Sequence, residues 1–219
     1  ASAPQPTKLV QESLMFLTHF VGDIHQPLHS ARASDRGGNS IDVTFDEYPS
    51  RTGSRLSWGR RHDEHSHDQH NHRHGNNETH HQWELHAVWD TGIIERAIDL
   101  TYNESRAALE GELWEYIMHA KETGELYKWL QCNDTRQHTC TTLWAEESFE
   151  NALAWAYKNS DSSESEVTPG THLSDNYYQT RLVKIKHFLS VAGARLAAAL
   201  EIALAKSATS PNSVLTASL

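Results

Sequence analysis

The sequence predicts a mainly α-helical protein: a helical bundle with a short β-hairpin or strand and a His-rich loop insertion. Apolar residues recur at helical spacing through most of the chain, whereas strict alternation of apolar and polar residues is confined to residues 41–45. Residues 46–81, which are crowded with histidines, follow neither period. We therefore expect helices packed on helices, with little sheet.

The first expected helix spans residues 7–26. Its apolar residues follow the i, i+3, i+7 spacing of one helix face, and Phe16 and Phe20 make the opposite face apolar as well. A helix that is apolar on most sides is typical of a buried position, and Pro27 ends it. The main stripe consists of Leu14, Leu17, Val21 and Ile24.

One short strand and several long helices follow. The strand is predicted by Ile41, Val43 and Phe45, which alternate with polar residues after a Gly-Gly-Asn turn. Later helices are expected at residues 86–100, 102–121, 144–158 and 174–206, and Ser174 is suited to cap the last one. Its buried side is expected to comprise Tyr177, Leu182, Ile185, Leu189, Leu196 and Leu200.

The length of 219 residues favours one domain. We expect residues 1–206 to form it, with residues 46–81 as a low-complexity insertion and residues 207–219 as a flexible tail. The apolar stretch at 192–205 contains Arg195 and Glu201 and falls short of the ~20 apolar residues that a membrane span needs. The sequence therefore predicts no transmembrane span, and we expect a monomer.

The charge balance restricts how the protein could bind a polyanion. Asp and Glu number 29 against 19 Lys and Arg, which gives a formal net charge of -10. This balance excludes a protein that holds nucleic acid through a broad basic surface. A phosphate substrate would need bound metal to supply the positive charge.

Cysteines and glycosylation motifs indicate the compartment. Cys132 and Cys140 lie close together in a polar segment, which suits a small disulfide-closed loop and suits a reduced pair almost as well. Asn-X-Ser/Thr motifs at Asn77, Asn103 and Asn133 predict glycosylation. Together these features favour a secreted, lumenal or cell-surface protein in which the two cysteines are bonded.

Two His-Asp pairs form the strongest candidate for chemistry. His19 and Asp23 lie four residues apart and therefore on one helix face, and His86 and Asp90 repeat this spacing at the head of another helix. His29 follows just after the first helix. A hydrogen-bonded core pair would explain one such motif, but helical bundles build metal sites from pairs of this kind on facing helices. Imidazole and carboxylate ligands without cysteine favour a catalytic zinc site.

The sequence around these residues resembles a known family. The runs FLTHFVGDIHQPLHSARASDRGGNSIDVTF (residues 16–45) and LHAVWDTGI (residues 85–93) are similar to the class I zinc-dependent nucleases, which include fungal single-strand-specific nucleases and 3'-nucleotidase/nucleases. WAEES at 144–148 and AGARLAAAL at 192–200 are also similar. The resemblance implies a helical hydrolase that cleaves the P–O3' bond of single-stranded RNA or DNA and of 3'-nucleotides by a metal-activated hydroxide.

The resemblance also implies three zinc ions in a complete domain. His19 and Asp23 would serve the first ion, Asp23 would also reach the third, and His29, His86 and Asp90 would hold the second. The family's other ligands, and the Asp and Arg that assist its chemistry, find no match, because residues 1–18 contain no His, Asp or Trp. By this resemblance they lie upstream, so we expect these 219 residues alone to bind fewer than three zinc ions and to hydrolyse poorly.

Polar neighbours of the ligands could orient them by hydrogen bonds, and His25, Gln26 and Asn39 are candidates. The family's pattern often has Asn where this sequence has Thr91, so base preference does not carry over.

Two alternatives compete with the nuclease. Zinc phospholipase C resembles this sequence in its H-x3-D-x5-H element, but that family presents Glu where Asp90 stands. A non-catalytic metal-binding protein would instead use the histidine-rich run at residues 62–81. Hydrolysis assays with single-stranded nucleic acid, 3'-AMP and phosphatidylcholine separate the three.

Overall fold

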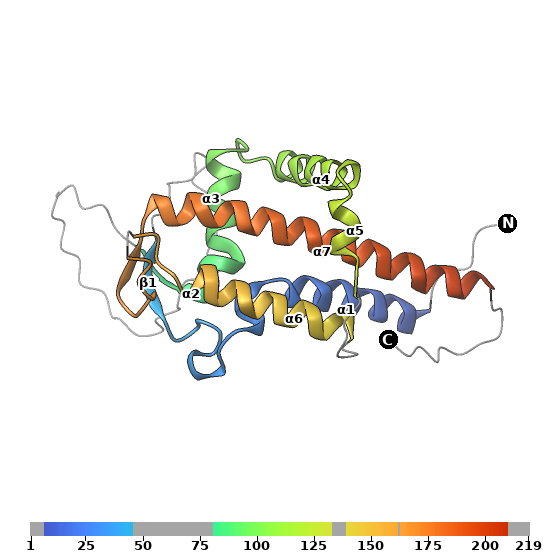
Figure 1. The fold of residues 1–219 in the computed structure, drawn as a ribbon, viewed down its shortest axis with the longest axis horizontal. Helices are drawn as coiled ribbons and strands as arrows, with labels where there is room; N and C mark the ends of the chain where they lie inside the picture. Colours follow the sequence, from blue (N-terminus) through green and yellow to red (C-terminus); the bar gives the residue numbers. More distant parts are fainter. Residues whose placement is uncertain (1–6, 46–80, 133–138, 162, 210–219) are drawn as a thin grey trace.

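The computed structural model describes residues 7–45, 81–132, 139–161 and 163–209. The long helix α7 (Asp175–Thr209) runs through the molecule and contacts α1 (Lys8–Ile24), α3 (Ile93–Leu100), α4 (Arg106–Glu122) and α5 (Glu125–Trp129) (Figure 1). The helix α6 (Cys140–Asn151) lies beside α1. This arrangement confirms the mainly helical fold that the sequence predicts.

Short and irregular helical turns connect the long helices. After α1 come the 3-10 turns η1 (Pro27–Ser30) and η2 (Ala33–Asp35). The expected helix at 86–100 is a continuous run of α2 (Leu85–Ala87), the π-helical turn η3 (Val88–Gly92) and α3. A second π-helical turn, η4 (Ala152–Ala156), extends α6. The sequence predicts these helices within a few residues, but neither their π-helical turns nor α5.

The helix α4 begins later than the sequence predicts. Asn103 and Glu104 adopt positive φ angles of 49° and 64°, which interrupts the helix expected from residue 102. Ser105 then caps α4 by accepting a hydrogen bond from the Ala108 N–H. Ser174 likewise caps α7, as predicted, through its hydroxyl and the Tyr177 N–H.

A small sheet closes one end of the molecule. The predicted strand is β1 (Asp42–Phe45), which pairs antiparallel with β2 (His81–Glu84) and parallel with β3 (Thr171–Leu173). Val43 lies opposite Trp83 on one side and Thr171 on the other. The sequence predicts β1 alone, because neither β2 nor β3 shows the repeated apolar–polar alternation of β1.

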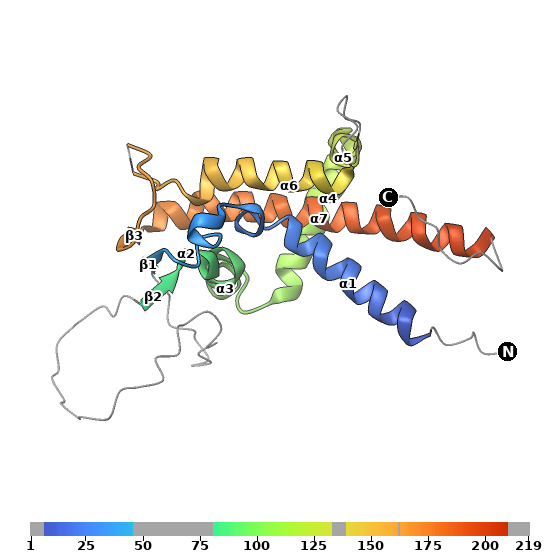
Figure 2. The same ribbon diagram turned by 90° about the horizontal axis from the view of Figure 1, so that it is seen from below.

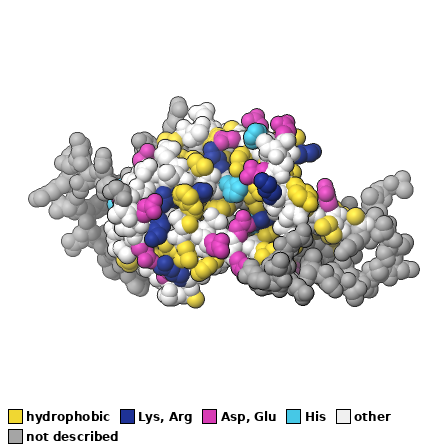
Figure 3. All heavy atoms as spheres, in the orientation of Figure 1, with side chains coloured by type: hydrophobic (Ala, Val, Ile, Leu, Met, Phe, Trp, Pro, Cys, Tyr) yellow, Lys and Arg dark blue, Asp and Glu magenta, His cyan; other side chains and the backbone are white. Residues whose placement is uncertain are grey.

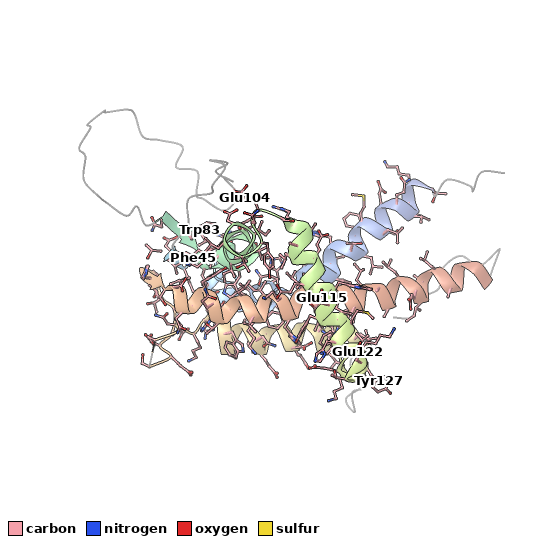
Figure 4. All side chains as sticks on the ribbon, turned by 90° about the horizontal axis from the view of Figure 1, so that it is seen from above. Phe45, Trp83, Glu104, Glu115, Glu122 and Tyr127 are labelled. Carbon is pink, nitrogen blue, oxygen red and sulfur yellow. A yellow bond between two sulfur atoms is a disulfide. The ribbon has the colours of Figure 1, made fainter. Side chains whose placement is uncertain are left out.

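The main core lies between this sheet, η3, α3 and the first half of α7. Phe45 and Trp83 meet edge to face at a centroid distance of 6.3 Å, and both lie at the sheet end in Figure 4. Trp89 is 2% exposed and donates its indole N–H to the Tyr177 hydroxyl, 2.8 Å away. This contact ties η3 to α7.

The expected burial of the first helix is wrong. The helix α1, all of which is described, buries Val21 alone, and Phe16 and Phe20 are 58% and 60% exposed. The N-terminal half of α1 runs away from α7 (Figure 2), and most of its residues are exposed. On α7, Leu189 is also exposed rather than buried, whereas Tyr177, Leu182 and Ile185 are buried as predicted.

The apolar character of α7 and one disulfide bear on where the protein could reside. The part of α7 from Asp175 to Ala205 is long and apolar enough to cross a membrane by length and composition, contrary to the sequence expectation. The most apolar window of this helix is 17% buried, whereas its first half packs in the core and Arg195 is hydrogen-bonded to Glu147 at 2.7 Å. Cys132 and Cys140 form a disulfide, which confirms the predicted bond.

Candidate metal centre

The structure brings all five predicted ligand residues into one connected group. The end of α1 carries His19 and Asp23, whose Nε2 and Oδ2 atoms are 3.1 Å apart. The following turn η1 carries His29, whose Nδ1 lies 3.6 Å from Asp23 Oδ1. On its other side His29 Nε2 lies 3.2 Å from Asp90 Oδ1.

The tightest part of this group is the triad of His29, His86 and Asp90. Each residue offers one ligand atom, and these atoms all lie within 4.8 Å of one another. The two imidazole rings stack at a centroid distance of 4.9 Å, and His86 Nε2 lies 3.3 Å from Asp90 Oδ2. Side-chain exposures of 27%, 17% and 36% leave the triad accessible from solvent.

Asp90 sits inside the π-helical turn η3. Turns of this kind widen a helix locally and are frequent at functional sites. Val88 and Trp89, which precede Asp90, are fully packed in the core, so the backbone beneath the carboxylate is anchored. The close approach of Gly92 to Phe45 and Trp83 anchors the other end of the turn.

A backbone carbonyl fixes the orientation of His86. Its Nδ1 lies 2.7 Å from the Gly37 carbonyl oxygen, an acceptor, so Nδ1 carries the proton and donates it. Nε2 then faces Asp90, to which it donates a hydrogen bond in the metal-free protein when the ring is protonated, and it is the nitrogen that can bind a metal once that proton is lost. Gly37 has a φ of 63°, and a Cβ there would lie 2.4 Å from the Leu28 carbonyl oxygen, so this position requires glycine.

The contacts within the triad shift its pKa values. Burial alone would raise the pKa of Asp90, but hydrogen bonds from His29, His86 and Gln26 outweigh burial and hold this pKa well below its usual range. Burial alone would lower the pKa of His86, but the hydrogen bonds to Asp90 and Gly37 outweigh it and raise this pKa above 6.5. Asp90 is therefore ionised and ready to bind a cation.

The group opens into a cleft of about 650 Å³. Asp23, His29 and His86 line it, together with Phe20 and Arg36. On the face of the molecule shown in Figure 3, Lys and Arg are interspersed with Asp and Glu, so this face carries no broad basic surface.

The three polar neighbours that the sequence suggests have different roles. Gln26 donates a hydrogen bond to Asp90 and is part of the site. His25 is buried, donates to the Val21 carbonyl oxygen and accepts from Arg195. Asn39 donates to the Arg36 carbonyl oxygen. The contribution of the Gly37 carbonyl is missed by sequence reasoning, although the Gly-Gly pair at 37–38 marks the turn.

The remaining predicted sites are only partly covered by the described residues. Asn103 is exposed in the turn before α4, a position open to glycosylation. Asn77, Asn133 and most of the histidine-rich run lie outside the described residues.

The fold and site define a helical protein with a His/Asp cluster suited to a metal ion in an open cleft. Comparison with known families agrees: the S1/P1 Nuclease family model matches residues 2–55 and 62–205. The chain therefore belongs to the S1/P1 nuclease family.

Named relatives agree with this assignment. Endonuclease 2 of Arabidopsis thaliana is 32% identical over 200 residues, which cover 91% of this chain and 54% of the relative. Endonuclease 4 of the same plant is 34% identical over 189 residues, covering 86% of this chain and 49% of the relative. Nuclease S1 of Aspergillus oryzae is 28% identical over 200 residues, which cover 87% of this chain and 53% of the relative. The chain spans about half the length of the curated relatives it matches.

Proposed function

We propose that this protein is a zinc-dependent phosphoesterase that hydrolyses single-stranded RNA or DNA and the 3'-phosphate of 3'-nucleotides by cleaving the P–O3' bond. The observation that carries the proposal is the convergence of His29, His86 and Asp90 within 4.8 Å in a member of a nuclease family. Relatives named as endonucleases and as Nuclease S1 support the same class of reaction.

The donor set of the triad fits zinc. Two imidazoles and one carboxylate form the three-ligand set that catalytic zinc sites use, and such a set leaves coordination positions open for substrate. Asp90 is ionised, as a metal requires, and the Gly37 carbonyl leaves His86 Nε2 as the nitrogen that gives up its proton when a metal binds. We assign His29, His86 and Asp90 to one zinc ion, and His19 and Asp23 to a second, with Asp23 also available to a third.

Zinc, when bound, supplies positive charge at the phosphate and lowers the pKa of water so that a hydroxide nucleophile is available at neutral pH. The protein itself contributes the fixed ligand positions. The Gly37 carbonyl holds the His86 ring, and the core beneath Val88 and Trp89 holds Asp90. Because the chain has a net charge of -10, its affinity for a phosphate depends on this centre more than on surface charge.

The cleft favours a single-stranded substrate. Phe20 lines the cleft next to the ligand residues, and 60% of it is exposed. An exposed aromatic ring can stack on an unpaired base without reading its identity. A base held in a duplex is already stacked on its neighbours and cannot offer this face.

Export from the cytosol is part of the proposal. The Cys132–Cys140 disulfide and the exposed Asn103 motif suit a secreted, lumenal or cell-surface protein. Mass spectrometry of the protein from its native source should find glycan on Asn103, and an unmodified Asn103 with free thiols would contradict export.

The direct test is hydrolysis of single-stranded DNA, duplex DNA, 3'-AMP and phosphatidylcholine by the protein from its native source. We expect cleavage of the first and third substrates, loss of activity with a chelator and recovery with zinc. His29→Ala should lower the activity, whereas His119→Ala, on an exposed position of α4, should not. Chelator-resistant activity, or preference for phosphatidylcholine, would overturn the proposal.

A further inference from the structure

The side chain of Gln26 joins two segments that carry different ligand residues. Gln26 is the N-cap of η1, where its Oε1 accepts a hydrogen bond from the Leu28 N–H. Its Nε2 donates a hydrogen bond of 2.7 Å to Asp90 Oδ1, on η3. The same residue therefore contacts the turn that carries His29 and the carboxylate that lies opposite it.

The two contacts demand the same orientation of the Gln26 amide. A backbone N–H can only donate, so it must face the amide oxygen, and an ionised carboxylate can only accept, so it must face the amide nitrogen. Reversing the amide would place two donors together at Leu28 and two acceptors together at Asp90. Leu28 is 1% exposed, so the core fixes one end of this link.

From this geometry we infer that Gln26 is a positioning residue that sets the Asp90 carboxylate against His29 before a metal ion binds. The inference rests on the proposed function, because it concerns the same zinc site. Asp90 Oδ1 is shared by Gln26 and His29, while Oδ2 faces His86, so the bond from Gln26 restricts rotation of the carboxylate. A neutral amide does this without adding a negative charge or a competing ligand.

A preformed site binds a metal more tightly, because less side-chain freedom is lost on binding. Removal of a hydrogen-bond partner of a metal ligand commonly costs 10- to 100-fold in metal affinity. Gln26 should therefore affect zinc affinity more than it affects the stability of the metal-free protein.

Two variants separate the two ends of the Gln26 side chain. Gln26→Ser keeps an oxygen that can cap η1 but is too short to reach Asp90. Gln26→Met is similar in length and loses both hydrogen bonds. Gln179→Met, at an exposed position of α7, is the matched control. The full chain could bind zinc with more than one affinity, and each affinity defines one zinc-binding class. The class that Asp90→Ala removes is the one that belongs to this centre.

The measurements are zinc affinity by competition with a chromophoric chelator, the visible spectrum of the cobalt-loaded protein, and the melting temperature without metal. We expect Gln26→Ser to lower zinc affinity about 10- to 100-fold at the site that Asp90→Ala abolishes. It should also change the cobalt absorption bands, while its melting temperature stays near that of the parent. Gln26→Met should lower zinc affinity at this site by a similar factor, and its melting temperature should be lower than that of the parent.

Parent-like zinc affinity in Gln26→Ser would overturn the inference, whether or not Gln26→Met binds zinc more weakly. The role of Gln26 would then be to cap η1. Failure of the proposed zinc site has a different signature. In that case Asp90→Ala would itself leave every zinc-binding class unchanged.

Discussion

The two His-Asp pairs share one spacing but not one kind of support. His86 and Asp90 lie on helical turns whose neighbours Leu85, Val88 and Trp89 are at most 2% exposed. His19 and Asp23 lie on α1, where Val21 is the one buried residue, and their side chains are 67% and 39% exposed. The same i, i+4 motif therefore gives an anchored ligand pair where the helix rests on the core and a loosely supported pair where it does not.

The largest effect should come from the residue that connects the two pairs. Asp23 contacts His19 on α1 and His29 on η1, so Asp23→Ala should weaken more than one zinc site. We expect the hydrolysis rate to fall roughly 10³-fold, since loss of several kcal/mol of charge stabilisation costs a factor of ten per 1.36 kcal/mol. His29→Ala, which damages one site directly, should cost less.

Steady-state assays with 3'-AMP at saturating zinc measure this difference. Glu110→Ala, an exposed carboxylate on α4, is the control and should keep the parent rate. If Asp23→Ala retained more activity than His29→Ala, Asp23 would not connect the two pairs.

The anchored pair can be broken through the backbone that orients it. Gly37→Ala places a Cβ 2.4 Å from the Leu28 carbonyl oxygen at a φ of 63°. Strain and overpacking should together cost about 2–4 kcal/mol in the free energy of unfolding and should displace the carbonyl that holds His86. Urea denaturation measures this cost.

Gly193→Ala is the control for this prediction. Gly193 lies on α7 with open space around it, so this substitution should stabilise the protein slightly. Equal effects at the two glycines would contradict the role of Gly37.

The disulfide should stabilise the fold without affecting the centre. Cys132 and Cys140 close a small loop before α6, far along the chain from every ligand residue. Cys132→Ser with Cys140→Ser should lower the free energy of unfolding by somewhat less than ~3 kcal/mol, the value for a fifteen-residue loop. Zinc affinity should stay at the parent value. A large loss of zinc affinity in this double variant would show that the loop supports the site.

The smallest expected effect is a pH dependence of the anchored pair. The raised pKa of His86 means that its protonated form stabilises the metal-free protein below about pH 6.5, and this contribution is lost as the pH rises through the folded pKa. Zinc needs the neutral ring, so affinity at the triad should fall as the pH drops, beginning above pH 6.5. An NMR titration of the His86 ring without metal checks this. Titration at or below pH 6.5 would contradict it.

The sequence could predict the ligand pairs because four residues make about one helical turn, and this holds at both pairs. It could not predict how His29 meets His86 and Asp90, since that contact depends on nonlocal packing, in which the Gly37 carbonyl oxygen lies 2.7 Å from His86 Nδ1. The link from Gln26 to Asp90 spans 64 residues and is equally nonlocal. The π-helical turn at Asp90 could not be predicted either, because the apolar residues around it keep the spacing of an ordinary helix.

The wrong prediction for α1 has a similar cause. Apolar residues on several faces, such as Phe16 and Phe20, indicate which surface prefers burial but not whether another element covers it. Figures 1 and 2 show α1 and α7 extending past the core, where their apolar residues remain exposed. Strands β2 and β3 were missed for the complementary reason, because β1 from a distant segment defines them.

The most direct test of the central claim is anomalous diffraction at the zinc edge from crystals of the protein grown with zinc. We expect an anomalous peak with a ring nitrogen of His29, Nε2 of His86 and a carboxylate oxygen of Asp90 at ~2.0–2.2 Å. A structure in which zinc is bound elsewhere, while these three side chains contact one another without an ion, would contradict it.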